Sequence, residues 1–176
     1  SIIVLILFFS VSLSAQIQIV KVTGGIVEGV VNDGITSFKG IPFAAPPIGK
    51  LRWKSPQPVI PWEGVKKADA FSAAPIQDKM IAKMYFNDPV TSEDCLYLNV
   101  WTSAKSSNER LPVVMWIHGG GFAGGATSIP AYQGTSFAKK GIVFVSAAYR
   151  MGPLGFLAHP DLSKESGKGS GCYGIQ

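Results

Sequence analysis

Two nearly continuous apolar runs, residues 111–117 and 142–148, most constrain what this chain can fold into. Strands that are apolar on both faces are typical of a mostly parallel sheet covered on both sides. Between the runs lie a glycine-rich loop, residues 118–125, and a short helix within residues 134–141 that ends at a glycine. Strand, loop, helix and strand form the βαβ unit of an α/β fold. The sequence therefore predicts an α/β fold in which both runs are buried.

The segment upstream predicts antiparallel strands. Residues 17–23, 26–31 and 35–41 are short β-prone runs, separated by Gly24-Gly25 and by Asn-Asp-Gly at 32–34. Tight turns between such runs are typical of hairpins. We therefore expect a three-stranded antiparallel meander that leads into the mostly parallel central sheet.

A proline-rich stretch follows at residues 42–61. Proline lacks the amide donor that a sheet requires, so this stretch predicts an ordered surface crossing. A PxxP ligand for another protein is the alternative. The interleaved aromatic and aliphatic residues favour packing against the fold, with Phe43, Leu51, Trp53 and Trp62 as anchors.

Composition favours a folded domain without a nucleic-acid partner. The chain is 47% hydrophobic and only 15% charged, which is enough apolar material for a core. The formal net charge is +5, but the basic residues are scattered, and Lys66-Lys67 and Lys139-Lys140 are the only adjacent pairs. Nucleic-acid binding requires a clustered basic patch. The charge therefore indicates a solvated surface.

The first 15 residues predict a signal peptide. Residues 2–9 are an unbroken apolar run, and the small residues at 10–15 resemble a cleavage site. A run this short does not cross a bilayer, which takes about 20 apolar residues. We expect cleavage after Ser14 or Ala15, export to the periplasm or the medium, and no stable membrane anchor. Because no charged segment precedes the run and the chain starts with Ser1, we expect its start to be truncated.

The glycine loop is the most informative segment for chemistry. It reads His-Gly-Gly-Gly-Phe from His118 to Phe122 and directly follows a predicted strand. A dinucleotide site also requires an acidic residue about 20 positions downstream, and none lies between Glu109 and Asp161. A phosphate-binding P-loop requires Gly-Lys-Ser/Thr, which is absent too. In lipases and esterases, a His-Gly-Gly-Gly loop after a sheet strand binds the oxyanion of ester cleavage. We expect that role here, against the alternative of a merely tight turn.

Four collinear segments resemble type-B carboxylesterases, the cholinesterase-like family of α/β-hydrolases. They are residues 38–53, 92–101, 116–122 and 149–157. Together they cover nearly all of residues 24–176, and the block from Glu93 to Trp101 is close to a family signature by itself. Within that family the chain resembles the bacterial para-nitrobenzyl-esterase-like enzymes. The resemblance implies the N-terminal part of an α/β-hydrolase fold.

The resemblance also implies roles for individual residues. The backbone N–H groups of Gly120 and Gly121 correspond to two oxyanion donors. His118 corresponds to a loop-bracing residue, with substrate contact as the alternative, and Phe122 to a substrate contact. No metal or cofactor is implied.

Three charged residues resemble structural residues of the family. Arg52 and Glu93 correspond to an ion pair that braces the N-terminal lobe, with two exposed charges as the alternative. Arg150 corresponds to a salt-bridge arginine whose acidic partner is expected just after Gln176.

The nucleophile is not found in this sequence. A serine hydrolase needs a Gly-x-Ser-x-Gly turn, and the nearest match, around Ser136, lacks the final glycine. Because the α/β-hydrolase order is serine, acid, histidine, neither His118 nor His159 is expected to be the base. We expect all three catalytic residues beyond Gln176, which makes residues 16–176 the incomplete N-terminal portion of one domain. Alone, this fragment is expected to be inactive and to aggregate through its open sheet edge.

The two cysteines depart from the family pattern. In exported relatives, the cysteine in the block around Cys95 is bonded to an earlier one, but residues 73–77 contain none. Cys172 stands where the family commonly has asparagine. We expect two free thiols, both buried or nearly so.

The function that the sequence favours for the full-length protein is hydrolysis of a carboxylic ester through an acyl-serine intermediate. The alternative is a catalytically inactive, cholinesterase-like adhesion or scaffold protein. An intact glycine loop favours the enzyme. The identity of the ester and the oligomeric state are left open by the sequence.

Overall fold

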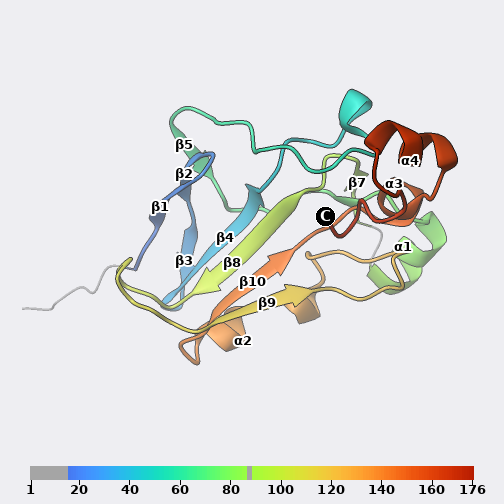
Figure 1. Ribbon diagram of the computed structural model, residues 1–176. Coiled ribbons are helices and arrows are strands. Elements are labelled where there is room, and N and C mark those ends of the chain that lie inside the picture. Colours follow the sequence, from blue (N-terminus) through green and yellow to red (C-terminus); the bar gives the residue numbers. More distant parts are fainter. Residues whose placement is uncertain (1–15, 87–88) are drawn as a thin grey trace, which may run out of the picture.

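The computed structural model describes residues 16–86 and 89–176 (Figure 1). The predicted signal peptide, residues 1–15, lies outside the described residues. The strands are β1 (Ile19–Val22), β2 (Gly25–Glu28), β3 (Val30–Asn32), β4 (Ile35–Pro42), β5 (Val65–Lys67), β6 (Ala74–Pro75), β7 (Thr91–Ser92), β8 (Tyr97–Thr102), β9 (Val113–Ile117) and β10 (Val143–Ala147). The helices are α1 (Lys79–Phe86), α2 (Thr135–Ala138), α3 (Gly152–Phe156) and α4 (Pro160–Ser166), with 3-10 turns η1 (Gly49–Leu51) and η2 (Pro130–Tyr132). None of the helices described is long and apolar enough to cross a bilayer.

A five-stranded sheet forms the centre of the molecule, in the order β3-β4-β8-β10-β9 (Figure 1). Its first three pairings are antiparallel, and β10 pairs with β9 in parallel, with Val143 opposite Val113. The predicted βαβ unit is confirmed, because the glycine loop and α2 connect β9 to β10. Antiparallel strands therefore lead into a parallel pair, and the central sheet is mixed rather than mostly parallel within the described residues.

Apolar side chains pack on both faces of this sheet because successive strand residues point to opposite sides. On one face, Phe38 and Ile41 of β4 pack with Val27. On the other, Trp101 of β8 contacts Phe144 of β10, with ring centroids 5.9 Å apart. Burial of each large apolar side chain stabilises the fold by about 1.5–3 kcal/mol.

A buried polar connection joins three central strands. The pairing of β4 with β8 shifts register between Phe38 and Ile41, and the N–H of Gly40 donates to Asn99 Oδ1 at 2.9 Å. Asn99 Nδ2 donates to Ser146 Oγ on β10 at 3.1 Å. Because both side chains are almost fully buried, these bonds satisfy polar groups that would otherwise destabilise the core.

The predicted three-stranded meander is wrong in one respect. The run at residues 26–31 divides at Gly29, so that β2 pairs with β1 and β5 while β3 pairs with β4 in the central sheet. At Gly29 a Cβ would lie 2.7 Å from the carbonyl oxygen of Ser37, closer than real Cβ atoms approach backbone. The close approach of the two segments thus requires a glycine where the chain changes sheets.

The expected burial of the first apolar run is also wrong. Within the described part of the chain β9 is an edge strand with only β10 as its neighbour, and Val113, Met115 and Ile117 are each at least 60% exposed. Burial on both faces requires covering elements. In the described part of the chain Tyr132 of η2 packs against Trp116, with ring centroids 5.3 Å apart, and the other side chains of β9 stay exposed. In the second run, β10 lies between two strands and buries Phe144 and Ser146.

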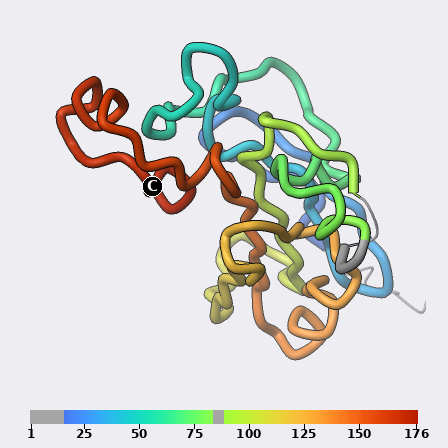
Figure 2. Tube along the Cα trace, turned by 90° about the vertical axis from the view of Figure 1, so that its right-hand side faces the viewer, coloured from blue at the N-terminus to red at the C-terminus, as the bar shows by residue number. Residues whose placement is uncertain are grey.

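The proline-rich stretch crosses the surface, as predicted, and is held by its tryptophans. Trp53 Nε1 donates to the carbonyl of Pro153 at 2.8 Å, and Trp62 Nε1 donates to that of Ile26 at 3.0 Å. Lys54 also forms an ion pair with Glu165 of α4. Figure 2 shows the C-terminal segment, in red, projecting beside this stretch, in teal. The contacts of Trp53 and Lys54 join the crossing to the segment that follows β10, and the contact of Trp62 joins it to β2.

Candidate active site

The glycine loop follows the carboxyl end of β9. Its backbone has a conformation that only glycine adopts readily. Gly120 has φ +132° and Gly121 has φ +59°. A Cβ at position 120 would lie 1.6 Å from the carbonyl oxygen of Gly124. The loop therefore closes on itself at Gly120 in a way that no larger residue permits.

The carbonyl groups of Gly119 and Gly120 are both held by hydrogen bonds. Gly120 O accepts from the N–H groups of Ala123 at 3.1 Å and Gly124 at 3.3 Å, and Gly119 O lies 3.0 Å from His118 Nδ1. The C=O and N–H of a trans peptide point in opposite directions. The N–H groups of Gly120 and Gly121 therefore face away from these bonds, and neither has an acceptor among the described residues.

His118 is buried beneath the loop. It is only 2% exposed, its ring stacks on Tyr149 with centroids 4.7 Å apart, and Tyr149 Oη donates to its carbonyl at 2.9 Å. Because the carbonyl of Gly119 only accepts hydrogen bonds, Nδ1 carries the proton. Burial lowers the pKa of His118 below its usual value, against a smaller opposing effect of the bond to Gly119. The imidazole is thus neutral and fixed in one tautomer at neutral pH.

Phe122 joins the glycine loop to α3. Its φ of +62° is unusual for a residue with a side chain and costs on the order of 1–3 kcal/mol. Its carbonyl accepts from the N–H of Gly152 at 2.7 Å, and its ring lies 4.4 Å from that of Phe156. These two contacts hold a strained residue in place, and such strain is concentrated at functional sites.

An open surface cavity of about 370 Å³, shallow rather than enclosed, lies beside the loop. It is lined by residues 121–123, 152–153 and 156–158. Apart from backbone groups its lining is apolar, including Phe122, Phe156 and Leu157. The loop thus borders a cavity that has both backbone amides and an apolar wall, which is common in ligand sites.

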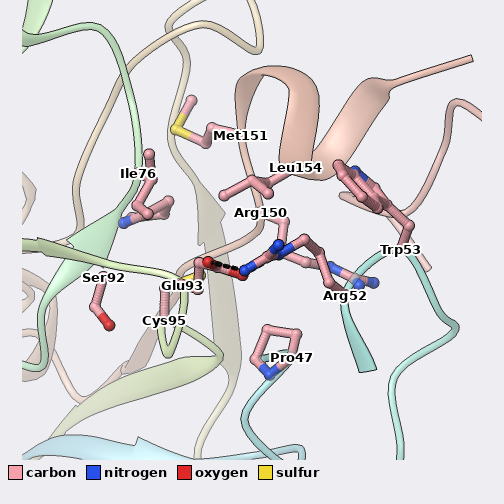
Figure 3. A pocket seen from close by; sticks show the side chains of 11 residues that line it. Pro47, Arg52, Trp53, Ile76, Ser92, Glu93, Cys95, Arg150, Met151 and Leu154 are labelled. Atoms are coloured by element: carbon pink, nitrogen blue, oxygen red, sulfur yellow. Dashed lines mark hydrogen bonds and ion pairs between the residues drawn. The ribbon is translucent and has the colours of Figure 1, made fainter. Parts of the chain in front are cut away.

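Arg52 and Glu93 form a bidentate ion pair that lines a pocket together with Arg150 and Met151 (Figure 3). Arg52 Nε and Nη2 each donate to a carboxylate oxygen of Glu93 at 2.6 Å. This hydrogen bonding, together with the carboxylate charge, raises the pKa of Arg52. The pair connects the surface crossing to the segment before β8.

Arg150 is buried behind this pair (Figure 3). Its guanidinium donates to the carbonyl of Lys54 at 2.8 Å and to that of Tyr173. Its Nε has no partner within the described chain. Burial lowers the pKa of Arg150. The acidic partner expected beyond Gln176 stays a prediction.

Both cysteines are free, as predicted, but they differ in environment. Cys95 is buried, and loss of hydration raises the pKa of its thiol to about 12. Cys172 is exposed, so the prediction that both thiols are buried is wrong for this residue. Cys172 lies in the irregular segment after α4, where no packed element covers it.

The other polar residues considered from the sequence lie apart from the loop. Ser136 is exposed on α2, and His159 precedes α4, where its Nδ1 accepts from the N–H of Asp161 at 3.2 Å. Among the described residues, no group of three or more His, Cys, Asp and Glu side chains is arranged to hold a metal ion.

Sequence reasoning missed Gln77, whose side-chain amide forms two hydrogen bonds to the backbone of Gly125. The two residues are far apart in sequence, and neither periodicity nor any motif signals the contact. Only the fold brings them together.

Comparison with known proteins gives one consistent family. The profile of the carboxylesterase family matches residues 16–174. The chain is 48% identical over 152 residues to a fumonisin B1 esterase of Sphingopyxis macrogoltabida, covering 86% of this chain and 28% of that protein. It is 43% identical over 142 residues to a para-nitrobenzyl esterase of Bacillus subtilis, covering 80% of this chain and 29% of the relative.

Solved structures agree with this result. A para-nitrobenzyl esterase superposes with a TM-score of 0.79 at 38% identity, covering 89% of this chain and 32% of that one. A Geobacillus stearothermophilus carboxylesterase also gives 0.79 at 38% identity, covering 90% and 32%. The chain thus spans less than a third of the length of these relatives, and the predicted α/β-hydrolase fold is confirmed. The chain belongs to the carboxylesterase family.

Proposed function

We propose that the complete protein hydrolyses carboxylic esters through an acyl-serine intermediate, with the N–H groups of Gly120 and Gly121 as oxyanion donors. One observation carries the proposal. The carbonyl oxygens of Gly119 and Gly120 both form hydrogen bonds on one side of the loop. The N–H groups of the same two peptides, those of Gly120 and Gly121, point the other way and have no acceptor in the described chain. Gly121 also borders the cavity of about 370 Å³.

The proposed donors act on charge that appears only during the reaction. A serine outside the described residues attacks the ester carbon, and the carbonyl oxygen becomes an anion. The bond to the alcohol then breaks, the alcohol leaves with the proton taken from the serine, and water releases the acid from the acyl-serine. Donors fixed toward the developing anion favour the tetrahedral state over the flat ester, and one such donor is worth about 10²–10³ in turnover.

In this proposal His118 positions the loop and does not transfer protons. Its Nδ1–H bond to Gly119 O fixes the peptide plane that carries the Gly120 N–H. Its ring is buried and stacked on Tyr149, so it is well placed for this role. Substrate contact by His118 is the weaker alternative.

Phe122 is proposed to contact the substrate. Its side chain is 54% exposed and faces the cavity together with Phe156 and Leu157. We therefore propose that an apolar part of the ester lies against this wall. The relatives named fumonisin B1 esterase and para-nitrobenzyl esterase support an ester as the substrate class.

We further propose that residues 1–15 direct export of the protein. The apolar run followed by small residues supports this role. N-terminal sequencing of the exported protein is expected to start at Ala15 or Gln16. A mature protein that retains residues 2–9 would contradict the proposal.

The esterase proposal is tested with the complete protein and p-nitrophenyl acetate. We expect turnover that a serine-directed organophosphate abolishes, with one labelled serine per chain. An absence of turnover across p-nitrophenyl esters of several lengths, with no organophosphate labelling, would favour the inactive adhesion or scaffold protein instead.

A further inference from the structure

The side-chain amide of Gln77 forms hydrogen bonds with both backbone groups of Gly125. Its Oε1 accepts from the N–H at 2.8 Å, and its Nε2 donates to the carbonyl at 2.8 Å. This orientation is the one that the network permits, because the reverse would place donor against donor and acceptor against acceptor. Gln77 thus pairs with Gly125 as a neighbouring strand would.

The amide of Gln77 is itself fixed from its own segment. Its Nε2 also donates to the carbonyl of Pro75 at 3.1 Å, and Pro75 lies in β6. The next residue, Asp78, accepts from the N–H groups of Met80 and Ile81 at 2.9 and 3.0 Å, which anchors the start of α1. Gln77 is therefore held between a strand and a helix cap.

Gly125 in turn lies directly against the groups that orient the proposed oxyanion donor. Its φ is +149°, and a Cβ there would lie 2.2 Å from His118 Nδ1 and 2.9 Å from Gly119 O. These two atoms form the bond that fixes the Gly119–Gly120 peptide. Gly125 thus packs closely against this bond, and we expect a displacement of Gly125 to disturb the imidazole and the peptide plane together.

We propose that Gln77 is a positioning residue for the oxyanion loop, acting through Gly125 on the His118–Gly119 bond. The inference rests on the proposed esterase function. The stretch before α1 carries no recognisable motif. Through Gln77, it would control the direction in which the Gly120 N–H points.

The first test compares Gln77→Met with Gln57→Met in the complete protein. Methionine keeps the length of the side chain and removes its hydrogen bonds. Gln57 is a matched control, because its Nε2 donates to the carbonyl two residues earlier, Ser55, and its side chain is exposed away from the loop. We expect kcat for p-nitrophenyl acetate to fall about 10- to 100-fold in Gln77→Met, with KM changed less than about threefold. Gln57→Met is expected to match the wild type.

The second test is Gln77→Glu across pH. An ionised carboxylate would accept from the Gly125 N–H but would face the carbonyl oxygens of Gly125 and Pro75. When protonated, it both accepts and donates as the amide does. The titratable groups around it are His118, behind Gly125, Asp78, next in the chain, and Arg52, Glu93, Cys95 and Arg150, which share a pocket with Pro75 and Ile76. We expect the ratio of variant to wild-type kcat to rise at least about fivefold from pH 8 to pH 5.

Hydrogen exchange of residues 118–125 separates this inference from the proposed function. We expect at least about tenfold faster exchange in Gln77→Met and no change in Gln57→Met. Unchanged exchange together with unchanged kcat would overturn the role of Gln77, even if the protein is an esterase. Faster exchange in Gln77→Met would still support the positioning role if the wild type shows no turnover and the esterase proposal fails. Should Gln77→Met not fold, the pH dependence of Gln77→Glu decides, and a flat ratio refutes the role.

Discussion

Substitution of Gly120 by alanine perturbs the proposed oxyanion donors directly. The new Cβ would lie 1.6 Å from the carbonyl oxygen of Gly124, whereas real Cβ atoms essentially never approach closer than 3.0 Å. The atom that it meets is backbone, so no side chain can rotate away. The φ of +132° adds strain that alanine does not relieve. The loop must therefore open at the residue that carries one proposed donor and precedes the other.

The size of the effect follows from that displacement. A shift of about 1 Å in a reacting geometry costs on the order of 10²-fold in rate, and loss of one oxyanion donor costs 10²–10³-fold, about 2.7–4 kcal/mol. The flat ester gains little from these donors, so substrate binding should change little. We predict that Gly120→Ala lowers kcat at least about 100-fold while KM stays within about threefold.

The assay is p-nitrophenyl acetate turnover by the complete protein, with thermal melting to check folding. Gly169→Ala is the matched control, because its Cβ would meet nothing within 4 Å and its φ lies outside the positive region. The control should retain wild-type kcat. If Gly120→Ala keeps kcat within threefold of the wild type at an unchanged melting temperature, the reasoning is refuted.

Three further predictions concern thiols, pH and the isolated chain. In the native protein at pH 8, iodoacetamide should label Cys172 rapidly and Cys95 only slowly, because burial raises the pKa of Cys95 to about 12. Both should be labelled after unfolding without reductant, and a failure to label both would indicate a disulfide. For His118, burial lowers the folded-state pKa below the unfolded value of about 6.5, so its stabilising contribution is complete above that pH and is lost as pH falls below it. The difference in unfolding free energy between wild type and His118→Asn should shrink from pH 7.5 to pH 5; a constant difference would count against a buried neutral imidazole. Residues 16–176 expressed alone should lack p-nitrophenyl acetate turnover and bind a hydrophobic dye through the exposed apolar side chains of β9; organophosphate-sensitive turnover would contradict this.

Local patterns predicted the features that depend on local chemistry. The glycine run identified the loop, because positive φ at Gly120 and Gly121 is a property of those residues themselves. The continuous apolar runs identified β9 and β10 and their parallel connection. The tryptophans of the proline-rich stretch were correctly interpreted as anchors, since a large ring with one polar atom commonly finds a backbone partner.

Features that depend on the choice of tertiary partner were not predictable. Gly29 occurs within a β-prone run, and only the close approach of Ser37 explains why the chain changes sheets there. Exposure of β9 depends on which elements cover it, which its own side chains do not encode. The pairing of Gln77 with Gly125 arises only once β6 and the glycine loop are brought together.

The most direct measurement is a crystal structure of the complete protein bound to a trifluoromethyl ketone, which forms a tetrahedral adduct with a serine nucleophile. We predict that the adduct oxygen lies about 2.7–3.1 Å from the backbone nitrogens of both Gly120 and Gly121. An adduct oxygen that points elsewhere, with those two N–H groups bonded to the protein's own backbone, would contradict the account.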